Sequence, residues 1–228
     1  MNESILMAIE SMCDDIATNP DANDNYKRAE AIMALTISGN MLPREAAGKE
    51  CSDDYEQEPT TNITLPKPGT HFDYKGMEFI ALNAEQGGLL AVAAQTLPDE
   101  MAFDEDDCND WRSSTLREYL NKEYIKNFND EDLLPFVSDL TADNGMKDYG
   151  TCEDKLAILS DAHYRAYREY IPEYEKTFVW SITPWSCLPT YAYYERVVYS
   201  RTGNIIINNA SITYGVAPAC IFNPKIFE

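Results

Sequence analysis

The chain has 228 residues, of which 44% are hydrophobic, and this length and composition suit one good-sized domain with a small extension. The net charge is −21 and is concentrated in the first half of the chain. Residues 1–60 carry 13 acidic and 4 basic residues, whereas residues 171–228 carry 4 of each. Because phosphate backbones bind lysine and arginine, this balance argues against direct binding to DNA or RNA.

No apolar run is long enough to cross a bilayer, and the N-terminus has acidic residues where a secretory signal carries positive charge. We therefore expect no membrane partner and a cytoplasmic protein. None of the six cysteines forms a pair two residues apart, and only two histidines are present. This argues against a zinc ribbon or a thioredoxin-type motif, so we expect free thiols, no metal and no other cofactor.

Two amphipathic helices are expected near the N-terminus, over residues 4–18 and 25–38, because apolar residues recur there at helical spacing. Residues 49–62 are almost devoid of aliphatic side chains and are typical of a linker. We divide the chain into a helical N-terminal region with an acidic linker, residues 1–58, and a main domain, residues 59–228. The apolar stripe of the helices either packs on the main domain or joins copies of the chain into a homo-oligomer.

The main domain is expected to open with strands. Residues 72–74 and 77–82 flank Lys75-Gly76 as a hairpin, and a turn at Gly87-Gly88 leads into a buried strand over residues 89–94. An acidic stretch follows at residues 98–110. We interpret it as a solvated loop; calcium binding is the alternative, although the spacing matches no EF-hand loop.

Two helices are expected further along the main domain. One covers residues 111–124 and is capped by Ser113 or Ser114. After an acid-led strand at residues 154–159, the second runs from Ser160 to about Tyr170, and its His163 is interpreted as a surface or structural residue.

The C-terminal part of the chain, residues 178–222, differs from the rest in composition. Between Ser186 and Tyr214 the only charged residues are Glu195, Arg196 and Arg201, and most others are Tyr, Asn, Ser, Thr or β-branched. Such residues suit a contact surface, because they bury area at low entropic cost and still form hydrogen bonds. The alternative is that they simply form strands, which residues 197–199 and 205–207 are expected to do.

We take this C-terminal stretch as the candidate ligand-binding site, on loops rich in tyrosine, asparagine and serine. Tyr191 and Tyr193 would point the same way in an extended segment, with Tyr194 opposed. The candidate ligand-binding residues are Trp185, Tyr191, Tyr193, Tyr194, Tyr199, Asn204 and Asn208.

Four motifs occur in order: W-x-x-S-x-L-R-x-x-L-N at 111–121, K-L-A-I-L-S-D at 155–161, W-S-I-T-P at 180–184 and G-V-A-P-A at 215–219. Over roughly residues 68–223 the chain resembles a bacterial and phage domain-of-unknown-function family, itself similar to the C-type-lectin-like fold of diversity-generating retroelement variable proteins and formylglycine-generating enzymes. Ala217 stands where that family has arginine, so any ligand role of the arginine is not carried over.

The resemblance implies an α+β fold with a mixed, mainly antiparallel sheet, flanking helices and long loops. Within it we expect the early strand at 77–82 to pair with the last strand at 216–222. Trp111 and Trp180 are expected to anchor the core, since both are large and lie beside a cap or a turn.

Two functions remain open. The first is a non-enzymatic ligand- or protein-binding module, such as the variable protein of a diversity-generating retroelement in a phage or bacterium. The resemblance to phage proteins adds a phage-particle-associated protein to the expected cytoplasmic one. Residues 186–214 contain no Lys, Gln, Met or Trp and a single Glu, as adenine-directed mutagenesis of asparagine-type codons would leave. The alternative is an acidic phage or mobile-element inhibitor that mimics nucleic acid and binds a basic host protein.

An enzyme is the least favoured class. The chain contains no Ser-His-Asp order, phosphate loop or metal-ligand spacing. A thiol oxidation like that of formylglycine-generating enzymes would need two neighbouring cysteines, for which Cys187 and Cys220 are the only pair in the right region.

Overall fold

The structure is a computed structural model that describes residues 64–228. The helices expected at residues 4–18 and 25–38, the linker, the domain boundary after residue 58 and any self-association through the N-terminal helices lie outside the described residues. None of the helices within residues 64–228 has the length and apolar character that crossing a membrane requires.

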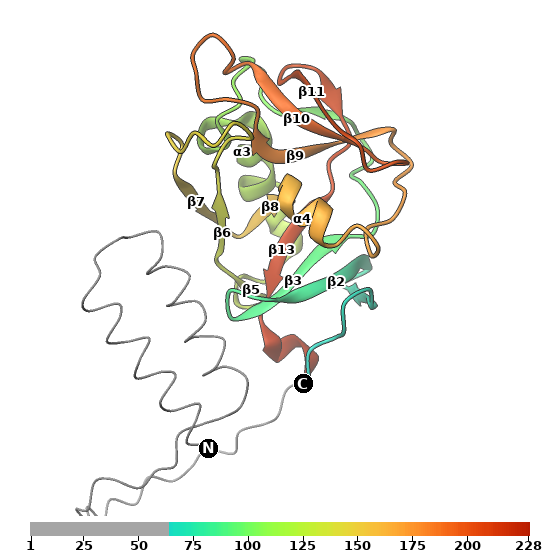
Figure 1. The fold of residues 1–228 in the computed structure, drawn as a ribbon. Coiled ribbons are helices and arrows are strands. Elements are labelled where there is room, and N and C mark those ends of the chain that lie inside the picture. Colours follow the sequence, from blue (N-terminus) through green and yellow to red (C-terminus); the bar gives the residue numbers. More distant parts are fainter. Residues whose placement is uncertain (1–63) are drawn as a thin grey trace, which may run out of the picture. The chain divides into compact units, whose positions relative to one another are not determined.

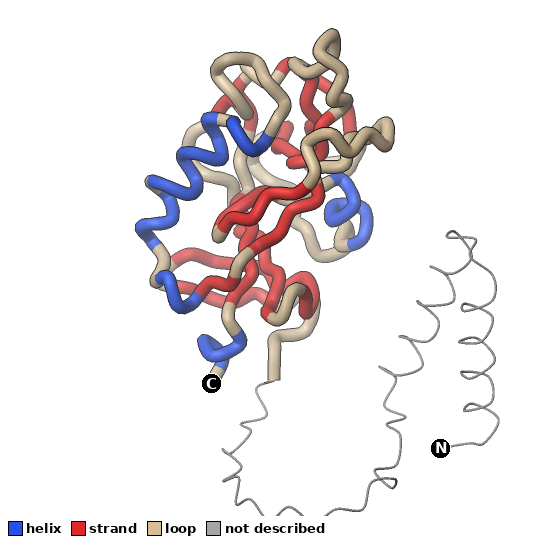
Figure 2. Tube along the Cα trace, turned by 90° about the vertical axis from the view of Figure 1, so that its left-hand side faces the viewer, coloured by secondary structure: helices blue, strands red, loops and turns tan. Residues whose placement is uncertain are grey.

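Strands dominate the described part of the chain, and helices are short (Figures 1 and 2). The strands are β1 (His71–Tyr74), β2 (Met77–Glu85), β3 (Gly88–Ala93), β4 (Met101–Ala102), β5 (Leu133–Leu134), β6 (Phe136–Asp139), β7 (Thr151–Asp154), β8 (Leu156–Ile158), β9 (Phe178–Pro184), β10 (Tyr194–Tyr199), β11 (Ile205–Asn209), β12 (Thr213–Tyr214) and β13 (Pro218–Phe222). The helical segments are η1 (Trp111–Ser113), α3 (Thr115–Lys122), η2 (Tyr124–Asn127), η3 (Asp130–Asp132), α4 (Asp161–Ala166) and η4 (Pro224–Phe227).

Two tight turns join the first three strands, as the sequence predicts. Lys75 and Gly76 join β1 to β2 with φ angles of 53° and 82°, and Gln86 and Gly87 join β2 to β3 with 49° and 83°. Positive φ at both central residues matches the twist of the flanking strands. Every residue of β3 is buried, which confirms the expected central strand.

The main sheet has the order β1-β2-β3-β13-β5, and β8 also pairs with β13. All of its pairings are antiparallel. The expected pairing of the early strand β2 with the last strand β13 is wrong, because the tight turn places β3 against β2 and leaves the other edge of β3 for β13. The C-terminal strand therefore lies in the middle of the sheet that the first strands begin.

The W-x-x-S-x-L-R-x-x-L-N motif joins α3 to the strands beside it. Trp111 donates from Nε1 to Asp154 Oδ2 at 2.9 Å, and Arg117 donates from Nε to Asp154 Oδ1 at 2.9 Å. Asn121 donates from Nδ2 to the Leu156 carbonyl at 2.8 Å and accepts from the Leu156 amide at 3.0 Å. The polar residues of this motif thus hold the fold together.

Both expected helix caps are present. The Ser114 hydroxyl accepts a hydrogen bond from the amide of Arg117, and Ser160 accepts one from the amide of His163 at 3.2 Å. His163 completes a capping box through Nδ1, which confirms a structural role for it. The second helix is shorter than expected, because α4 ends at Ala166 and turns follow it up to Tyr170.

The second sheet has three antiparallel strands in the order β11-β10-β9. It lies in the upper part of Figure 1, beyond α4 and β8 from the main sheet. Trp111 and Trp180 are fully buried, which confirms them as core residues, and each ring centroid lies 5.7 Å from that of Phe103. The fold is thus α+β with mainly antiparallel sheets.

Candidate functional site

The long loop between β9 and β10 carries most of the candidate residues. It runs from Trp185 to Tyr193 and forms the orange loop at the top left of Figure 1. Residues 189–193 are turn residues, so the expected extended arrangement of Tyr191 and Tyr193 is wrong. The rings of Tyr193 and Tyr194 instead lie side by side, with centroids 4.2 Å apart.

Asn109, which is fully buried, holds both ends of this loop. Its Nδ2 donates to the Ser186 carbonyl at 3.1 Å and to the Tyr194 carbonyl at 2.6 Å, and its backbone amide donates to the Ala192 carbonyl at 2.7 Å. The Tyr149 hydroxyl donates to its Oδ1 at 2.8 Å. A loop fixed at both ends keeps its shape before a ligand arrives, which lowers the entropic cost of binding.

The acidic loop at 98–110 supports the same region. The amide of Asp104 donates to the Ala210 carbonyl at 3.1 Å, and the Asp107 carboxylate accepts from the Ser211 amide at 3.0 Å. Asp104 itself is buried and accepts from the amides of Cys108 and Thr115, both at 3.0 Å. The expected solvated loop is therefore in part a buried support beneath the C-terminal loops.

Calcium binding by this loop gains no support. Within residues 64–228, no three His, Cys, Asp or Glu side chains come together in a way that could hold a metal ion. The carboxylates of Asp104 and Asp107 are instead engaged with backbone amides.

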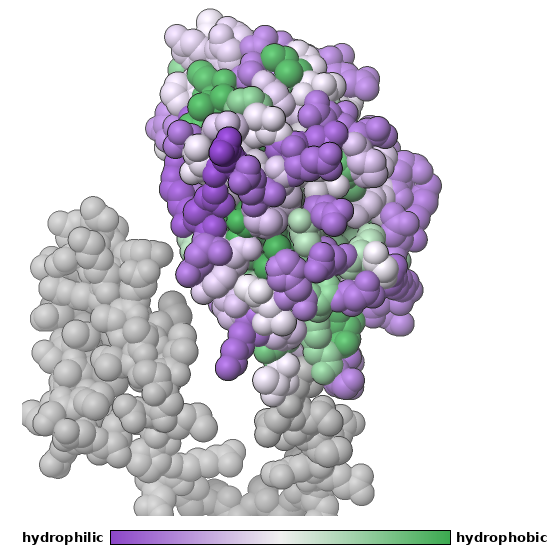
Figure 3. All heavy atoms as spheres, turned by 90° about the vertical axis from the view of Figure 1, so that its right-hand side faces the viewer, coloured by the Kyte–Doolittle hydropathy of each residue, from purple (hydrophilic) through white to green (hydrophobic). Residues whose placement is uncertain are grey.

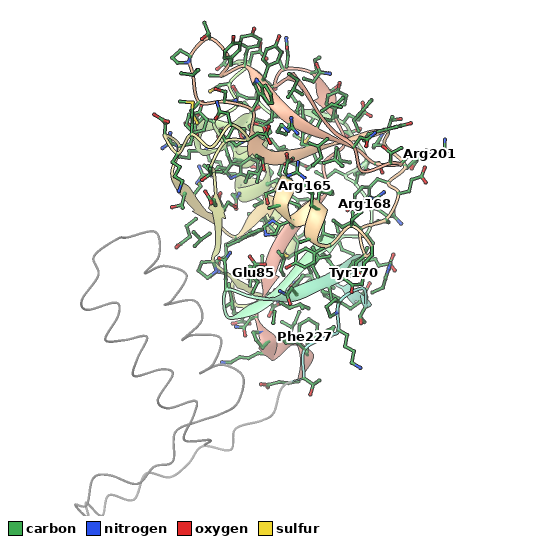
Figure 4. All side chains as sticks on the ribbon, viewed as in Figure 1. Glu85, Arg165, Arg168, Tyr170, Arg201 and Phe227 are labelled. Carbon is green, nitrogen blue, oxygen red and sulfur yellow. The ribbon has the colours of Figure 1, made fainter. Side chains whose placement is uncertain are left out.

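The candidate residues fall into two groups at opposite ends of the β10–β11 hairpin. Trp185, Tyr191, Tyr193 and Tyr194 lie at the end where the long loop enters β10. Tyr199 and Asn204 lie at the other end, where the Tyr199 amide donates to the Asn204 carbonyl at 2.8 Å. Figure 4 marks this second end with Arg201, on the right-hand side.

The exposure of the candidate residues differs. Tyr191 is 47% exposed, and Asn204 is also exposed. Tyr199 is half-buried and its ring packs 5.3 Å from that of Phe178, and Asn208 is half-buried and bonded to the Tyr214 hydroxyl. The other half-buried candidates are Trp185, Tyr193 and Tyr194.

Apart from Tyr191, sequence reasoning missed an apolar set in the same region. Six large hydrophobic side chains are exposed in the described part of the chain, and five of them come from residues 188–212. Figure 3 shows green apolar areas at the end of the domain that carries β10 and β11, set among paler and purple atoms. We call this set, together with Tyr193 and Tyr194, the C-terminal face; its exposed members are Leu188, Tyr191, Ile206, Ile207 and Ile212.

Two of the three charges of residues 186–214 are buried beside the face. Arg196 donates from Nε to Asp161 Oδ2 at 3.1 Å, lies 3.8 Å from Asp143, and stacks its guanidinium 5.6 Å from the Trp185 ring centre. Burial raises the pKa of Asp161, while Ser181 and Arg196 act in the opposite direction.

Glu195 is fully buried and accepts a hydrogen bond through Oε1 from the amide of Arg196 at 2.7 Å. Its Oε2 has no hydrogen-bond partner among the described residues. Burial raises the pKa of Glu195 well above its usual range and so favours the uncharged form of the group. Because Arg196 is paired and buried as well, Arg201 is left as the exposed charge of this stretch.

An open groove of about 530 Å³ lies beside the turn that carries Ile212. Its lining includes Ser211 and Thr213 together with Glu105, Thr115 and Tyr119. Sites that enclose small molecules are concave and mostly apolar, so an open groove of mixed polar and apolar lining suits an extended partner better.

The two cysteines considered for an oxidase site are both free thiols. Cys220 is fully buried in β13, whereas Cys187 is half-buried in the long loop. Burial raises the pKa of both thiols, which disfavours the reactive thiolate.

Comparisons of this chain with protein-family models, with curated proteins and with solved structures find no match. The function is therefore argued from the geometry of the C-terminal face.

Proposed function

We propose that this chain is a non-enzymatic binding module with a C-type-lectin-like fold, and that its C-terminal face binds a protein partner. One observation carries the proposal: five of the six exposed large hydrophobic side chains of the described residues come from residues 188–212. Single exposed hydrophobic residues are ordinary, but several that lie together mark an interaction site. The Ala210 amide donates to the Tyr193 carbonyl at 2.9 Å, which brings the turn that carries Ile212 beside the end of the long loop that carries Leu188 and Tyr191.

The polar surroundings of these side chains support recognition of a partner. Glu195 is fully buried and Arg196 is buried and paired with Asp161, so little charge has to be desolvated when the face is covered. Tyrosine and asparagine supply hydrogen bonds beside the aliphatic groups, as in antibody paratopes. The face is also uncharged within a chain of net charge −21, which distinguishes it from the rest of the surface.

The C-type-lectin-like assignment is supported by the arrangement of the two sheets. The last strand, β13, lies within the sheet that the first strands form, and the long loop and β10–β11 extend from a smaller second sheet. A scaffold of this kind holds variable loops on rigid strands. It agrees with a retroelement variable protein, in which residues 186–214 would be the diversified part.

Photo-crosslinking in bacterial cells tests the proposal. The full chain would carry a photoreactive phenylalanine analogue in place of Tyr191 or, as a matched control, in place of Val137, which is 42% exposed outside the face. We expect a discrete adduct with a second protein from position 191 and none from position 137. The same adducts at both positions, or none at either, would contradict the proposal.

The same crosslinking, repeated in a cell lysate over a salt series, addresses the acidic-inhibitor alternative. Binding through the uncharged face should persist at high salt, because it depends on apolar contact. An adduct that disappears as salt rises would instead favour a basic partner held by the acidic surface. An adduct between two copies of the chain would not count as a partner.

A further inference from the structure

The strand β11 is the open edge of the second sheet. It pairs with β10 in unbroken antiparallel register from Ile205 to Asn209, and no strand of the described chain pairs with its other side. The opposite edge of the sheet is covered: the Trp180 amide of β9 donates to Gly215 at 3.0 Å and the Ile182 amide to Leu159 at 3.1 Å.

The hydrogen bonds at the two ends of the hairpin show which residues of β11 face outward. The Tyr199 amide donates to Asn204, and the Ala210 amide donates to Tyr193 at 2.9 Å. Since hydrogen-bonded and non-bonded residues alternate along an antiparallel pair, the even-numbered residues of β11 turn their backbone groups toward β10. The odd-numbered ones, Ile205, Ile207 and Asn209, turn theirs outward.

Asn209 closes one end of this free edge. Its amide donates to Asn208 Oδ1 at 2.9 Å, and its carbonyl accepts from the Ile212 amide at 3.1 Å. The amides and carbonyls of Ile205 and Ile207 have no such partner in the described part of the chain. The free edge therefore offers the amide and the carbonyl of Ile205 and those of Ile207, two positions further along.

This edge lacks the features that normally prevent strand addition. Its sequence, I-I-I-N-N, has no charge and no proline, and its pairing with β10 has no bulge. Ile206 and Ile207 are 40% and 36% exposed. By contrast, β1, the edge of the main sheet, carries the exposed polar residues His71 and Asp73.

We propose that β11 pairs antiparallel with β11 of a second copy of this chain, across a two-fold axis at Ile206. In this register Ile205 of each copy faces Ile207 of the other, and each such pair exchanges two hydrogen bonds. All the free amides and carbonyls of both edges are then satisfied. The two three-stranded sheets become one continuous sheet.

A second copy fits this edge for two reasons. The outward groups are symmetric about Ile206, so the strand is complementary to itself, as a two-fold interface requires. The register also brings no like charges together, because residues 204–209 are uncharged. Elsewhere two chains of net charge −21 repel each other, so the dimer should form more readily as salt screens that repulsion.

The inference goes beyond the proposed function, although Ile206 and Ile207 of β11 belong to the C-terminal face. Strand pairing uses the backbone edge of β11, whereas Leu188 and Tyr191 lie on the long loop and stay available to a partner. A dimer would present two such loops on one assembly, which raises apparent affinity for a partner with repeated sites.

Disulfide trapping in the full chain tests the register. In the proposed dimer the two Ile206 residues form a non-hydrogen-bonded pair with Cα atoms about 4.5 Å apart, within the range that a disulfide spans. We expect the Ile206→Cys chain to form a covalent dimer joined at that position under mild oxidation, much faster than a Val137→Cys control. Equal rates for the two variants would overturn the proposal.

Sedimentation of the native full chain over a concentration series tests the dimer itself. We expect a monomer–dimer equilibrium that shifts toward dimer at high salt. Ile207→Pro removes one outward amide, which an edge strand tolerates, and should abolish the dimer. Ile206→Lys places like charges opposite each other and should also abolish the dimer. It serves as the test if the proline variant fails to fold.

A native chain that stays monomeric at every concentration would overturn the proposal and leave the edge for a different strand. A dimer that persists in both the Ile207→Pro and Ile206→Lys chains would place the contact elsewhere on the chain and also overturn it.

Discussion

Asn109 donates a 2.6 Å hydrogen bond from its side-chain amide to the backbone carbonyl of Tyr194, the residue at which the long loop ends and β10 begins. The two residues are 85 positions apart in the chain. The acidic loop and the C-terminal face are therefore one structural unit, in which a buried amide of the first sets the shape of the second.

Asn109→Ala should loosen the long loop. The change removes the side-chain bonds to Ser186 and Tyr194 and leaves two carbonyls without a donor, at a cost of about 1–3 kcal/mol in the free energy of unfolding. Hydrogen exchange of residues 186–194 should become faster than in the native chain. Asn127→Ala, which removes an exposed amide, is the control, and unchanged exchange in the Asn109 variant would refute this role.

Trp180 and Trp185 should differ in how much stability their loss removes. Trp180 is fully buried and donates from Nε1 to the Met101 carbonyl at 2.8 Å, so Trp180→Ala should lower the free energy of unfolding by about 3–5 kcal/mol. Trp185 is half-buried at the edge of the face, and Trp185→Ala should cost much less. Denaturant midpoints measure both, and equal losses would contradict the packing described above.

Glu195 should make the fold less stable as pH rises. Its pKa is raised in the folded chain relative to about 4.3 when unfolded, so its contribution to stability is complete at low pH and is lost as pH rises through the folded pKa. Glu195→Gln keeps the neutral form. The free energy of unfolding of this variant, relative to that of the native chain, should therefore increase as pH rises above the unfolded pKa of about 4.3.

Denaturant titrations across this pH range measure the difference, with Glu153→Gln on the exposed side of β7 as the control. A difference between the Glu195 variant and the native chain that stays constant with pH would show that the buried carboxyl does not titrate as described.

Features that depend on neighbouring residues could be predicted from the sequence. The Lys75-Gly76 turn, the caps at Ser114 and Ser160 and the strands at β10 and β11 follow from local preferences and alternation. Burial of Trp111 and Trp180 follows from their size. These predictions needed no knowledge of which strands pair.

Features that depend on distant residues could not be predicted from the sequence. The sequence does not show that β3 separates β2 from β13, because pairing of β13 with either β2 or β3 satisfies the same hydrophobic pattern. Nor does it show that Asn109 reaches the long loop, since an asparagine in an acidic stretch looks like any solvated residue. For the C-terminal face, composition indicated the region but not which side chains are exposed. Three consecutive isoleucines resemble a buried strand, and only the structure shows that β11 is the edge of its sheet.

The most direct measurement compares folding and binding in one variant of the C-terminal face. Leu188→Ser, Tyr191→Ser and Ile212→Ser together remove exposed apolar groups, so the free energy of unfolding should stay within about 0.5 kcal/mol per site of the native value. The same unlabelled chain, added in excess to a lysate, should fail to suppress the adduct formed by the chain photoreactive at position 191, whereas the native chain should suppress it. A large loss of stability, or full competition by the variant, would contradict the account that this face serves binding and not folding.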